Sequence, residues 1–574
     1  MSISTIKLFA YLYLFRLLNA LLCRTFFQPD EFYQSLEIAH HQVFGYGFVS
    51  WEWRNAFDQS SGGIRSPLYP FLFVPPYALL KYLRLDQTFL LILVPKLIQA
   101  AIAAVTDLAI YRLSARVTSH HYASAALSCS LTSFFNAYAG IRTFSNSAES
   151  ALTAVALSLW PWTGDQVAQS WTHLTISLCL AAISVIIRPS AVIFWALLGF
   201  QLLRHSHGET KMDVIALVSV VGCISAFACF VLDSCFYRLP TFTPLNFIRQ
   251  NVYNSLSSFY GLNRWHFYFT QAFTFVNLSL FPTVIIGMMS LSVAKVGLEN
   301  ELVLLRLRSA RFACLGTMLV LSVLPHKEFR FIQPLIPLFC VFAGRAMVNN
   351  YIEFRSLHPT PTQPSWLERT IQARPIGFIV RSVIAFGAAL YLLTFQYRGQ
   401  MAVVDYLRGV PETELQSVGL LAPCHSTPWQ SHLHRAHLAS EARNGSLLWM
   451  LSCEPPIHGQ NLAIYKDQSD SFYEDPIKFL VDHFPSAVND RFPGSIVNES
   501  SFQWPSHIVL FSNLLDVTSN QTSQGKARVG SFLQDLGYIT DKEFENGRWH
   551  DDRRREGKVI VMRWNPAESD KAAR

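Results

Sequence analysis

Long apolar runs recur over roughly the first two thirds of the chain, with polar residues gathered between them. A run of about twenty apolar residues is long enough to cross a bilayer as a helix. Eleven such runs lie at about 5–25, 89–111, 122–141, 147–162, 171–187, 189–204, 212–236, 270–295, 310–325, 331–349 and 376–396. The pattern predicts a polytopic helical membrane module, residues 1–396, followed by a polar second domain, residues 397–574.

A further apolar stretch, residues 66–83, is interrupted by Pro67, Pro70, Pro75 and Pro76. Proline removes a donor from the helical hydrogen-bond ladder, so we expect this stretch to be re-entrant or to lie in the membrane interface. With eleven spans and a cytosolic N-terminus, Lys and Arg gather in the cytosolic loops, as the positive-inside rule requires. The same count places the C-terminal domain on the lumenal side.

The amino-acid composition agrees with the prediction of a polytopic membrane module, because it is typical of an integral membrane protein. Of 574 residues, 51% are hydrophobic and only 15% are charged, which excludes an ordinary soluble enzyme. The first apolar run carries Arg16 and lacks a small-x-small cleavage site. We therefore interpret it as a signal anchor and not as a cleaved signal peptide.

The C-terminal domain carries its own pattern. Apolar runs at 447–451, 508–511 and 559–562 predict buried strands, and helices are expected near 475–483 and 529–537, which together indicate a small α/β domain. On the lumenal side its sequons can be glycosylated at Asn444, Asn498 and Asn520. Cys424 and Cys453 are the only two of the ten cysteines in this polar domain, and they could pair there.

Two clusters of ionisable residues lie at the ends of apolar runs. Asp30 and Glu31 follow the first run, and the second cluster is His326–Phe331. Charged groups at membrane depth are costly and usually functional, so these clusters are the candidate active site. With eleven spans both fall on the lumenal side, together with a catalytic loop at 26–88 and a second loop at 237–269.

The chemistry of a lipid-linked sugar phosphate suits these clusters. Its leaving group is a phosphodiester-type anion, which requires cations and no general acid. The candidate phosphate-binding residues are His326, Lys327, Arg330, Arg142 and Arg188, with Glu328 in support. The acceptor hydroxyl requires a base, which we expect to be Asp30 or Glu31. One such carboxylate is enough for an inverting single displacement.

Aromatic side chains beside hydroxyl-binding groups suit sugars, whose C–H faces stack on rings. The candidate acceptor-binding residues are Tyr46, Trp51, Trp53 and His266.

Other interpretations of the charged clusters stay open. Asp30 and Glu31 could simply cap the following helix, and the basic cluster could reach toward lipid head groups. A lipid or solute transporter would share the composition, although the clusters lie at span ends and no inverted repeat is evident.

Several motifs resemble one known family. Pro29-Asp30-Glu31, Glu37-x-x-His40, Trp51-Glu52-Trp53 and His326-Lys327-Glu328-x-Arg330-Phe331 are similar to motifs of glycosyltransferase family 22, the dolichyl-phosphate-mannose-dependent α-mannosyltransferases. The resemblance covers the whole membrane part and implies a GT-C glycosyltransferase fold of about eleven transmembrane helices. It also implies catalysis without a metal or other cofactor. Many family members have His where this chain has Gln28, and Glu where it has Phe329, so neither residue is assigned a role.

Within the family, further motifs are similar to the member that acts on the third mannose of the glycosylphosphatidylinositol (GPI) precursor. They are residues 423–428, residues 261–271 and the Trp-Glu-Trp triplet. This resemblance implies an α1,2-mannosyltransferase of the endoplasmic reticulum, with dolichyl-phosphate-mannose as donor and the GPI precursor glycolipid as acceptor. Its partners would be membrane lipids and no nucleic acid. Members that act on the fourth GPI mannose or on the lipid-linked N-glycan precursor are the alternatives.

Overall fold

The computed structural model describes residues 4–55, 62–293, 300–357, 376–439, 445–457, 460–462, 464–522 and 525–567. The chain forms two compact units, which are described separately. Unit 1 consists of Met1–Leu22, Glu52–Tyr69 and Pro95–Leu390, and unit 2 of Cys23–Trp51, Pro70–Val94 and Tyr391–Arg574. The last break lies close to the boundary expected from the sequence. Unit 2 also includes two N-terminal segments, which the sequence pattern assigned to the membrane module.

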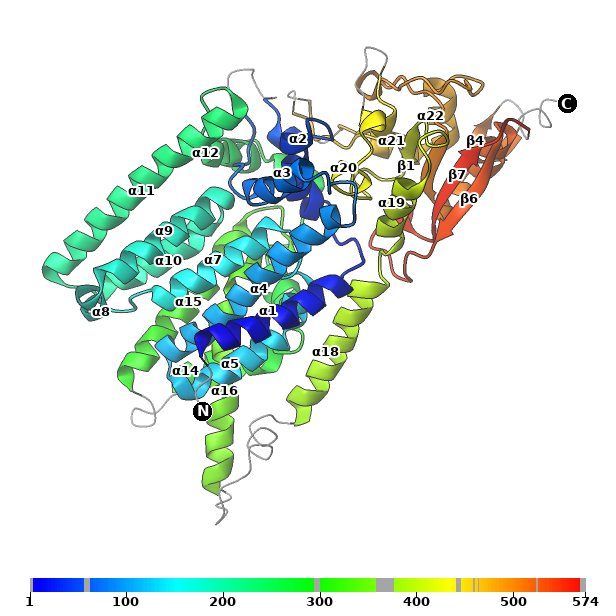
Figure 1. The fold of residues 1–574 in the computed structure, drawn as a ribbon. Coiled ribbons are helices and arrows are strands. Elements are labelled where there is room, and N and C mark those ends of the chain that lie inside the picture. The colour runs from blue at the N-terminus through cyan, green and yellow to red at the C-terminus, as the bar shows by residue number, and fades with distance from the viewer. Residues whose placement is uncertain are drawn as a thin grey trace. The chain divides into compact units, whose positions relative to one another are not determined.

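Unit 1 is helical (Figure 1). Its helices are α1 (Thr5–Leu22), α4 (Leu90–Val117, which starts in unit 2), α5 (His120–Leu131), α6 (Phe134–Tyr138), α7 (Ser145–Leu159), α8 (Gly164–Gln169), α9 (Trp171–Ile187), α10 (Ala191–Arg204), α11 (Gly208–Tyr237), α12 (Thr243–Ile248), α13 (Phe273–Val276), α14 (Phe281–Val293), α15 (Glu301–Val323), α16 (Ile336–Leu357) and α18 (Ile376–Thr394, which ends in unit 2). Short 3-10 or π turns lie at η2 (Trp51–Trp53, which starts in unit 2), η4 (Arg249–Tyr253), η5 (Leu256–Tyr260), η6 (Tyr268–Ala272) and η7 (Phe329–Leu335).

The helices of unit 1 pack through apolar faces, and buried ion pairs join some of them. Helix α16 packs against α5 and α14, and α9 packs against α7, α10 and α11. A Cβ atom at Gly344 would collide with the backbone of Ala126, so glycine permits the close approach of α16 and α5. Between α1 and α4, Arg16 donates to both carboxylate oxygens of Asp107, at 2.6 and 2.8 Å. Arg16 is therefore a paired interior cation.

Helices lie at all eleven positions where spans were predicted. By length and composition, five helices of the described ranges could cross a membrane, or six if the bent pair Tyr268–Val276 and Phe281–Leu291 is one span. Two shorter apolar helices are Trp171–Ile187 and Ala191–Arg204. The number of spans stays a prediction. The proline-rich stretch forms η3 (Pro70–Leu72) and α3 (Val74–Tyr82), and nine residues of helix are too few to span.

Unit 2 combines helices with a mixed sheet (Figure 1). Besides η3 and α3, its helical elements are η1 (Phe32–Leu36), α2 (Glu37–Phe44), α19 (Gly399–Gly409), α20 (Gln430–Leu433), η8 (Ala436–Ala439), α21 (Gln468–Glu474), α22 (Pro476–His483), η9 (Val497–Glu499), α23 (Ser512–Leu515), α24 (Val529–Asp535) and η10 (Arg553–Arg555). The strands are β1 (Val418–Leu421), β2 (Leu448–Met450), β3 (His507–Phe511), β4 (Thr518–Thr522), β5 (Gly525–Arg528), β6 (Tyr538–Phe544) and β7 (Val559–Trp564).

The five-stranded sheet has the order β2-β1-β3-β7-β6, and β4 pairs with β5 separately. Strands β2, β1 and β3 are parallel, whereas β7 is antiparallel to both β3 and β6. Side chains alternate between the two faces of a strand. Ile508 and Leu510 join a core with residues of α22 and α24, while Val509 lies with residues of α19. Helices thus cover both faces, which confirms the predicted strands and the small α/β domain.

Candidate active site

The two acidic candidates begin a helical segment in unit 2. Pro29 accepts backbone hydrogen bonds from Phe32 and Tyr33, each at 2.9 Å, so the helical turn starts directly at the Pro-Asp-Glu motif. Glu31 is buried, with 7% of its surface exposed, and Asp30 is half-buried. The π-helical turn η1 follows immediately, and such turns are frequent at functional sites. The Glu31 side chain makes no capping hydrogen bond to this turn.

Residues 423–435 lie along this helical segment, and we call them the brace. The brace contacts Tyr33, Glu37 and His40, whose spacing of four and three residues places them on one helical face. The Tyr33 hydroxyl donates to the carbonyl of Thr427 at 3.0 Å. The brace, whose residues 423–428 resemble a motif of the known family, thus orients the helix that carries Asp30 and Glu31.

Glu37 is a fully buried contact of the brace. Its carboxylate accepts hydrogen bonds from the backbone N–H groups of Trp429 and Ser431, at 2.9 and 3.1 Å, and from the Ser431 hydroxyl at 2.6 Å. Burial raises the pKa of Glu37 from 4.5 to about 7, although these hydrogen bonds oppose the shift. The group therefore exchanges its proton near neutral pH.

A pH-dependent stability follows from Glu37. Because its folded pKa of about 7 exceeds its ordinary value of 4.5, the folded chain holds the extra proton between these values, and stability falls as the pH rises through this window. The loss is at most about 3 kcal/mol. Glu37→Gln should remove this slope in thermal unfolding measured from about pH 5 to about pH 8. The exposed control Asp482→Asn should keep the slope, and an unchanged slope in Glu37→Gln would contradict the assignment.

A second buried network fixes the next turn of the same helix. His434 Nε2 lies 3.0 Å from Asp86 Oδ2, and His434 Nδ1 lies 2.8 Å from His40 Nε2 and 3.1 Å from the Tyr46 hydroxyl. Burial, aided by the nearby histidines, lowers the pKa of His40 to about 3, so its ring is neutral. Tyr46 was predicted to bind the acceptor, and its hydroxyl contacts His434 in this structure.

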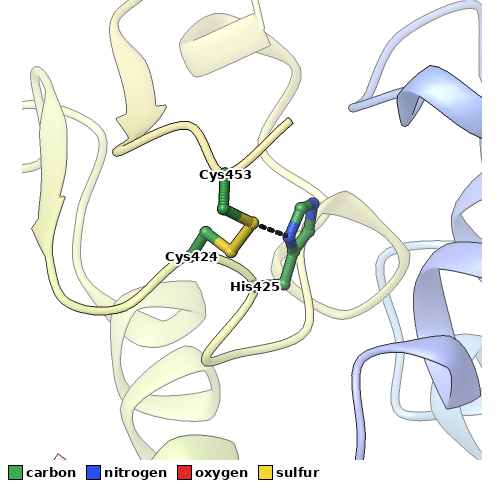
Figure 2. Close-up of side chains that lie close together, drawn as sticks. All are labelled: Cys424, His425 and Cys453. Carbon is green, nitrogen blue, oxygen red and sulfur yellow. Dashed lines mark hydrogen bonds between the residues drawn. A yellow bond between two sulfur atoms is a disulfide. The ribbon is translucent and has the colours of Figure 1, made fainter. Parts of the chain in front are cut away.

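The brace is also tied to the sheet of unit 2. Cys424 and Cys453 form a disulfide with Cα atoms 5.8 Å apart, and Cys453 follows strand β2 (Figure 2). His425 turns its ring toward this bond, with Nδ1 3.4 Å from Cys453 Sγ. The same ring meets Tyr33 edge to face at 4.4 Å. Cysteine binds zinc as a thiolate, so the two bonded sulfurs act as a tether and not as metal ligands.

The basic candidates form a connected cluster in unit 1. Arg330 donates to Glu328 through Nε at 2.7 Å and Nη2 at 2.8 Å, and His326 Nε2 lies 3.2 Å from the same carboxylate. Burial opposes ionisation of Glu328, but Arg330 and His326 outweigh it and hold its pKa well below the usual range. Burial likewise disfavours a charged His326, yet Glu328 raises the pKa of His326. Glu328 thus contacts both cations, and its supporting role stays a prediction.

Arg188 joins the same cluster through an aromatic ring. The guanidinium carbons of Arg188 and Arg330 lie 5.3 and 5.8 Å from the centroid of Phe331. Arg188 also donates to the Ser145 hydroxyl at 3.0 Å and pairs with Glu149 at 3.3 Å. Two guanidinium groups held beside one ring form a rigid cationic surface suited to a phosphate.

Two other basic candidates have different surroundings. Lys327 is buried, and its ammonium donates to the backbone carbonyl of Asn263 at 2.8 Å. Asn263 returns a hydrogen bond to the Lys327 carbonyl at 2.9 Å, which fastens the loop before η6 to the cluster. Arg142 is fully buried and donates to the Tyr138 carbonyl at 3.1 Å. Lys327 is therefore placed to support the loop more than to face a ligand.

The remaining candidates are spread over both units. Trp51 belongs to unit 2, whereas Trp53 and His266 belong to unit 1. Trp53 is buried against Phe236 at 6.0 Å, and His266 Nδ1 lies 2.9 Å from the Thr270 hydroxyl. The Phe329 ring packs on Phe267 and Phe275 at 5.1 and 4.7 Å, which gives it a packing role.

The predicted glycosylation sites also lie in unit 2. Asn498 is exposed on η9, Asn520 lies in strand β4, and Asn444 falls outside the described residues. Asn277 also begins an Asn-Leu-Ser sequon, but it is buried in unit 1 and donates to the Phe273 carbonyl at 3.0 Å.

Residues 7–434 match the Alg9-like mannosyltransferase family, which covers most of the chain. The chain belongs to this family. It is similar over nearly its whole length to GPI mannosyltransferase 3 from several yeasts. The identity is 33% with that of Debaryomyces hansenii, over 98% of this chain and 92% of that protein. It is 34% with that of Yarrowia lipolytica, over 95% of each, and 30% with that of Saccharomyces cerevisiae, over 95% and 94%.

Solved structures of other proteins share the fold of this Alg9-like family member. ArnT from Cupriavidus metallidurans bound to undecaprenyl phosphate aligns with a TM-score of 0.55 over 97% of each chain, at 13% identity. The Archaeoglobus fulgidus oligosaccharyltransferase aligns with a TM-score of 0.50 over 75% of this chain and 63% of that one, at 11% identity. The expected GT-C fold and glycosyltransferase class are confirmed: the protein is a multi-pass membrane glycosyltransferase.

Several residues that organise the site were not assigned from the sequence. Tyr33, Glu37 and His434 position the helical segment that begins at Asp30 and Glu31, which we call the acidic helix. Ser145 accepts from Arg188, and Asn146 donates to the Arg330 carbonyl at 3.2 Å, so both position the cations. Glu37 and His40 were visible only as part of the family motif. The pairing of Glu37 with Ser431 has no local signal, because the two residues are 394 positions apart.

Proposed function

We propose that this mannosyltransferase adds the third mannose, in α1,2 linkage, to the GPI precursor in the endoplasmic reticulum, with dolichyl-phosphate-mannose as donor. The observation that carries the proposal is the similarity to GPI mannosyltransferase 3 over almost the full length of both proteins. Similarity confined to the membrane helices would support only a shared fold. Here it extends through the brace and the C-terminal sheet.

The cation cluster supports a donor linked to a lipid phosphate. Arg188 and Arg330 present two guanidinium groups beside Phe331, which suits one phosphodiester. The structural relative ArnT was solved with undecaprenyl phosphate, another polyprenyl phosphate. A single phosphate requires no more charge than these groups and His326 supply, so we propose that catalysis is independent of metal ions.

The proposed reaction is a single displacement with inversion. The acceptor hydroxyl attacks the anomeric carbon of mannose as Asp30 takes the hydroxyl proton, with Glu31 as the alternative base. The bond from that carbon to the phosphate oxygen breaks, and its electron pair leaves with dolichyl phosphate. Arg330, Arg188 and His326 stabilise the negative charge on the leaving phosphate. Glu328 keeps His326 and Arg330 cationic and oriented.

The decisive experiment for the acceptor is a mass analysis of lipid-linked glycans in cells that lack the protein. Accumulation of a GPI intermediate with two mannoses is expected. A GPI intermediate with three mannoses would instead indicate action on the fourth. A truncated dolichol-linked oligosaccharide would indicate the N-glycan precursor, and unchanged glycans with altered lipid distribution would favour a transporter.

The proposed orientation predicts glycans on unit 2. If this unit faces the lumen, Asn498 should carry a glycan, because it is exposed on η9. Asn498→Gln should then remove one endoglycosidase-sensitive mobility shift on gels. The matched control Asn277→Gln should change nothing, because Asn277 is buried. Digestion of the region after residue 397 by protease added to intact microsomes would contradict this orientation.

A further inference from the structure

Within unit 2, a loop of the C-terminal domain is fixed to the end of the last apolar helix. The loop Asn546–Asp551, which we call the foot, precedes η10, and helix α18 ends at Thr394. Asn546 is buried, and its carbonyl accepts from the Tyr397 N–H at 3.1 Å. The Tyr397 hydroxyl donates to the Asp551 carboxylate at 3.0 Å.

The middle of the foot is held as firmly as its ends. The Gln396 side-chain amide donates to the backbone carbonyl of Trp549. The Tyr391 hydroxyl donates to Gln396 Oε1 at 3.1 Å. Gly547 has a φ of +91°, and a Cβ atom there would collide with Gln396. The foot therefore has a fixed conformation that requires glycine at this position.

Despite this fixed backbone, the foot exposes a large aromatic side chain. Trp549 is 71% exposed although its ring lies 5.6 Å from that of Tyr391. Phe395, at the end of α18, is 59% exposed. Tryptophan with one apolar face and one N–H donor is enriched where membrane meets water. The exposed ring therefore fits an environment that is neither a protein core nor bulk water.

Exposed cations lie next to these residues along the chain or at the same helix end. Arg398 and Arg548 adjoin Tyr397 and Trp549 in the sequence, and both are exposed. Arg24 is exposed as well, and its N–H donates to the Leu393 carbonyl at 2.8 Å, which places it at the same helix end. Aromatic rings with arginines at the end of an apolar helix are the composition of a membrane-interface anchor.

We propose that the foot, with the end of α18, is a lipid-binding surface that seats the C-terminal domain on the bilayer. Trp549 and Phe395 enter the boundary between head groups and acyl chains, and Arg24, Arg398 and Arg548 bind phospholipid phosphates. The choice of a bilayer as partner rests on continuity with α18, part of the candidate span Ile376–Gly409. Val383, Ile384 and Phe386 on that helix are 63 to 65% exposed, as a lipid-facing surface requires.

Photo-crosslinking in phospholipid nanodiscs tests this surface with the full-length protein. We would introduce p-benzoylphenylalanine at position 549, at position 395, and at position 464. Ile464 is the matched control, because it is an apolar side chain of unit 2 with 78% exposure that lies outside the foot. After irradiation, mass spectrometry would identify phospholipid adducts. We expect adducts at positions 549 and 395 and none at position 464.

Two outcomes would overturn the proposal. Lipid adducts at position 395 without any at position 549 would show that the foot stands clear of the bilayer. Equal adduct formation at positions 549 and 464 would show that the labelling is nonspecific.

A variant with Arg398→Gln and Arg548→Gln provides a second measurement, because it should lower adduct formation at position 549. An undiminished yield would overturn the role of the arginines. None of these residues belongs to the proposed catalytic machinery, so failure here leaves the proposed function intact.

Discussion

Mannose transfer is expected to fall by about 10²- to 10⁴-fold in Asp30→Asn, the range that a positioned general base contributes. The amide keeps the size of the side chain but cannot accept the acceptor proton. Glu31→Gln is expected to lower the rate less, because Glu31 is buried whereas Asp30 is partly exposed. The measurement is transfer of labelled mannose by purified protein at saturating donor and acceptor.

The control for this experiment is the integrity of the acidic helix. Thermal unfolding of Asp30→Asn should match that of the unsubstituted protein, since the contacts of the brace are made by Tyr33, Glu37 and His40. Normal transfer by a folded Asp30→Asn protein would refute the base assignment. A loss only in Glu31→Gln would move the role to Glu31.

The second large effect concerns the donor. Removing Arg330 should delete a charged hydrogen bond to the phosphate worth about 1.5–3 kcal/mol, which raises the KM for donor by roughly 10- to 150-fold. Arg330→Gln alone would also remove both hydrogen bonds from Arg330 to the Glu328 carboxylate, which would disturb the cluster itself. The substitution is therefore combined with Glu328→Gln. Steady-state kinetics with varied donor should show the change, with little effect on the KM for acceptor.

Lys327 supplies the matched comparison, because it belongs to the same motif. Its ammonium donates to the Asn263 carbonyl, so Lys327→Gln should loosen the loop before η6 and change the KM for donor much less. If both variants leave the donor dependence unchanged, the basic cluster does not bind the phosphate. If Lys327→Gln has the larger donor effect, the assignment to the guanidinium groups is wrong.

The strength of local sequence signals explains which elements were predicted well. The strand run at 508–511 became β3 (His507–Phe511), and the helix expected at 475–483 became α22 (Pro476–His483). In both cases the spacing of apolar residues within one segment is enough to predict the element. The four prolines at residues 67–76 likewise excluded a span, and the structure has the short helix α3 there. Prolines in the first turn of a helix cost little, which explains why a helix forms at all.

Contacts between distant segments give some residues partners that the sequence does not show. Tyr46 has the character of a sugar-binding residue in the sequence, but its hydroxyl contacts His434, 388 positions away. Lys327 has the character of a phosphate ligand, but it donates to a carbonyl of a loop 64 positions away. A side chain's type states what it can bind, whereas its neighbours in the fold decide which partner it has.

The sequence by itself determined the membrane class, the positions of the apolar helices, the strands β2, β3 and β7 of the C-terminal domain, and the two charged clusters. Each depends on hydrophobic period or residue type within a short segment. Only the tertiary structure decided that residues 23–51 and 70–94 belong with the C-terminal domain. It also decided that Glu37 is buried against Ser431. Burial and long-range hydrogen bonds set the pKa and orientation of a group, and they exist only after distant parts of the chain have packed together.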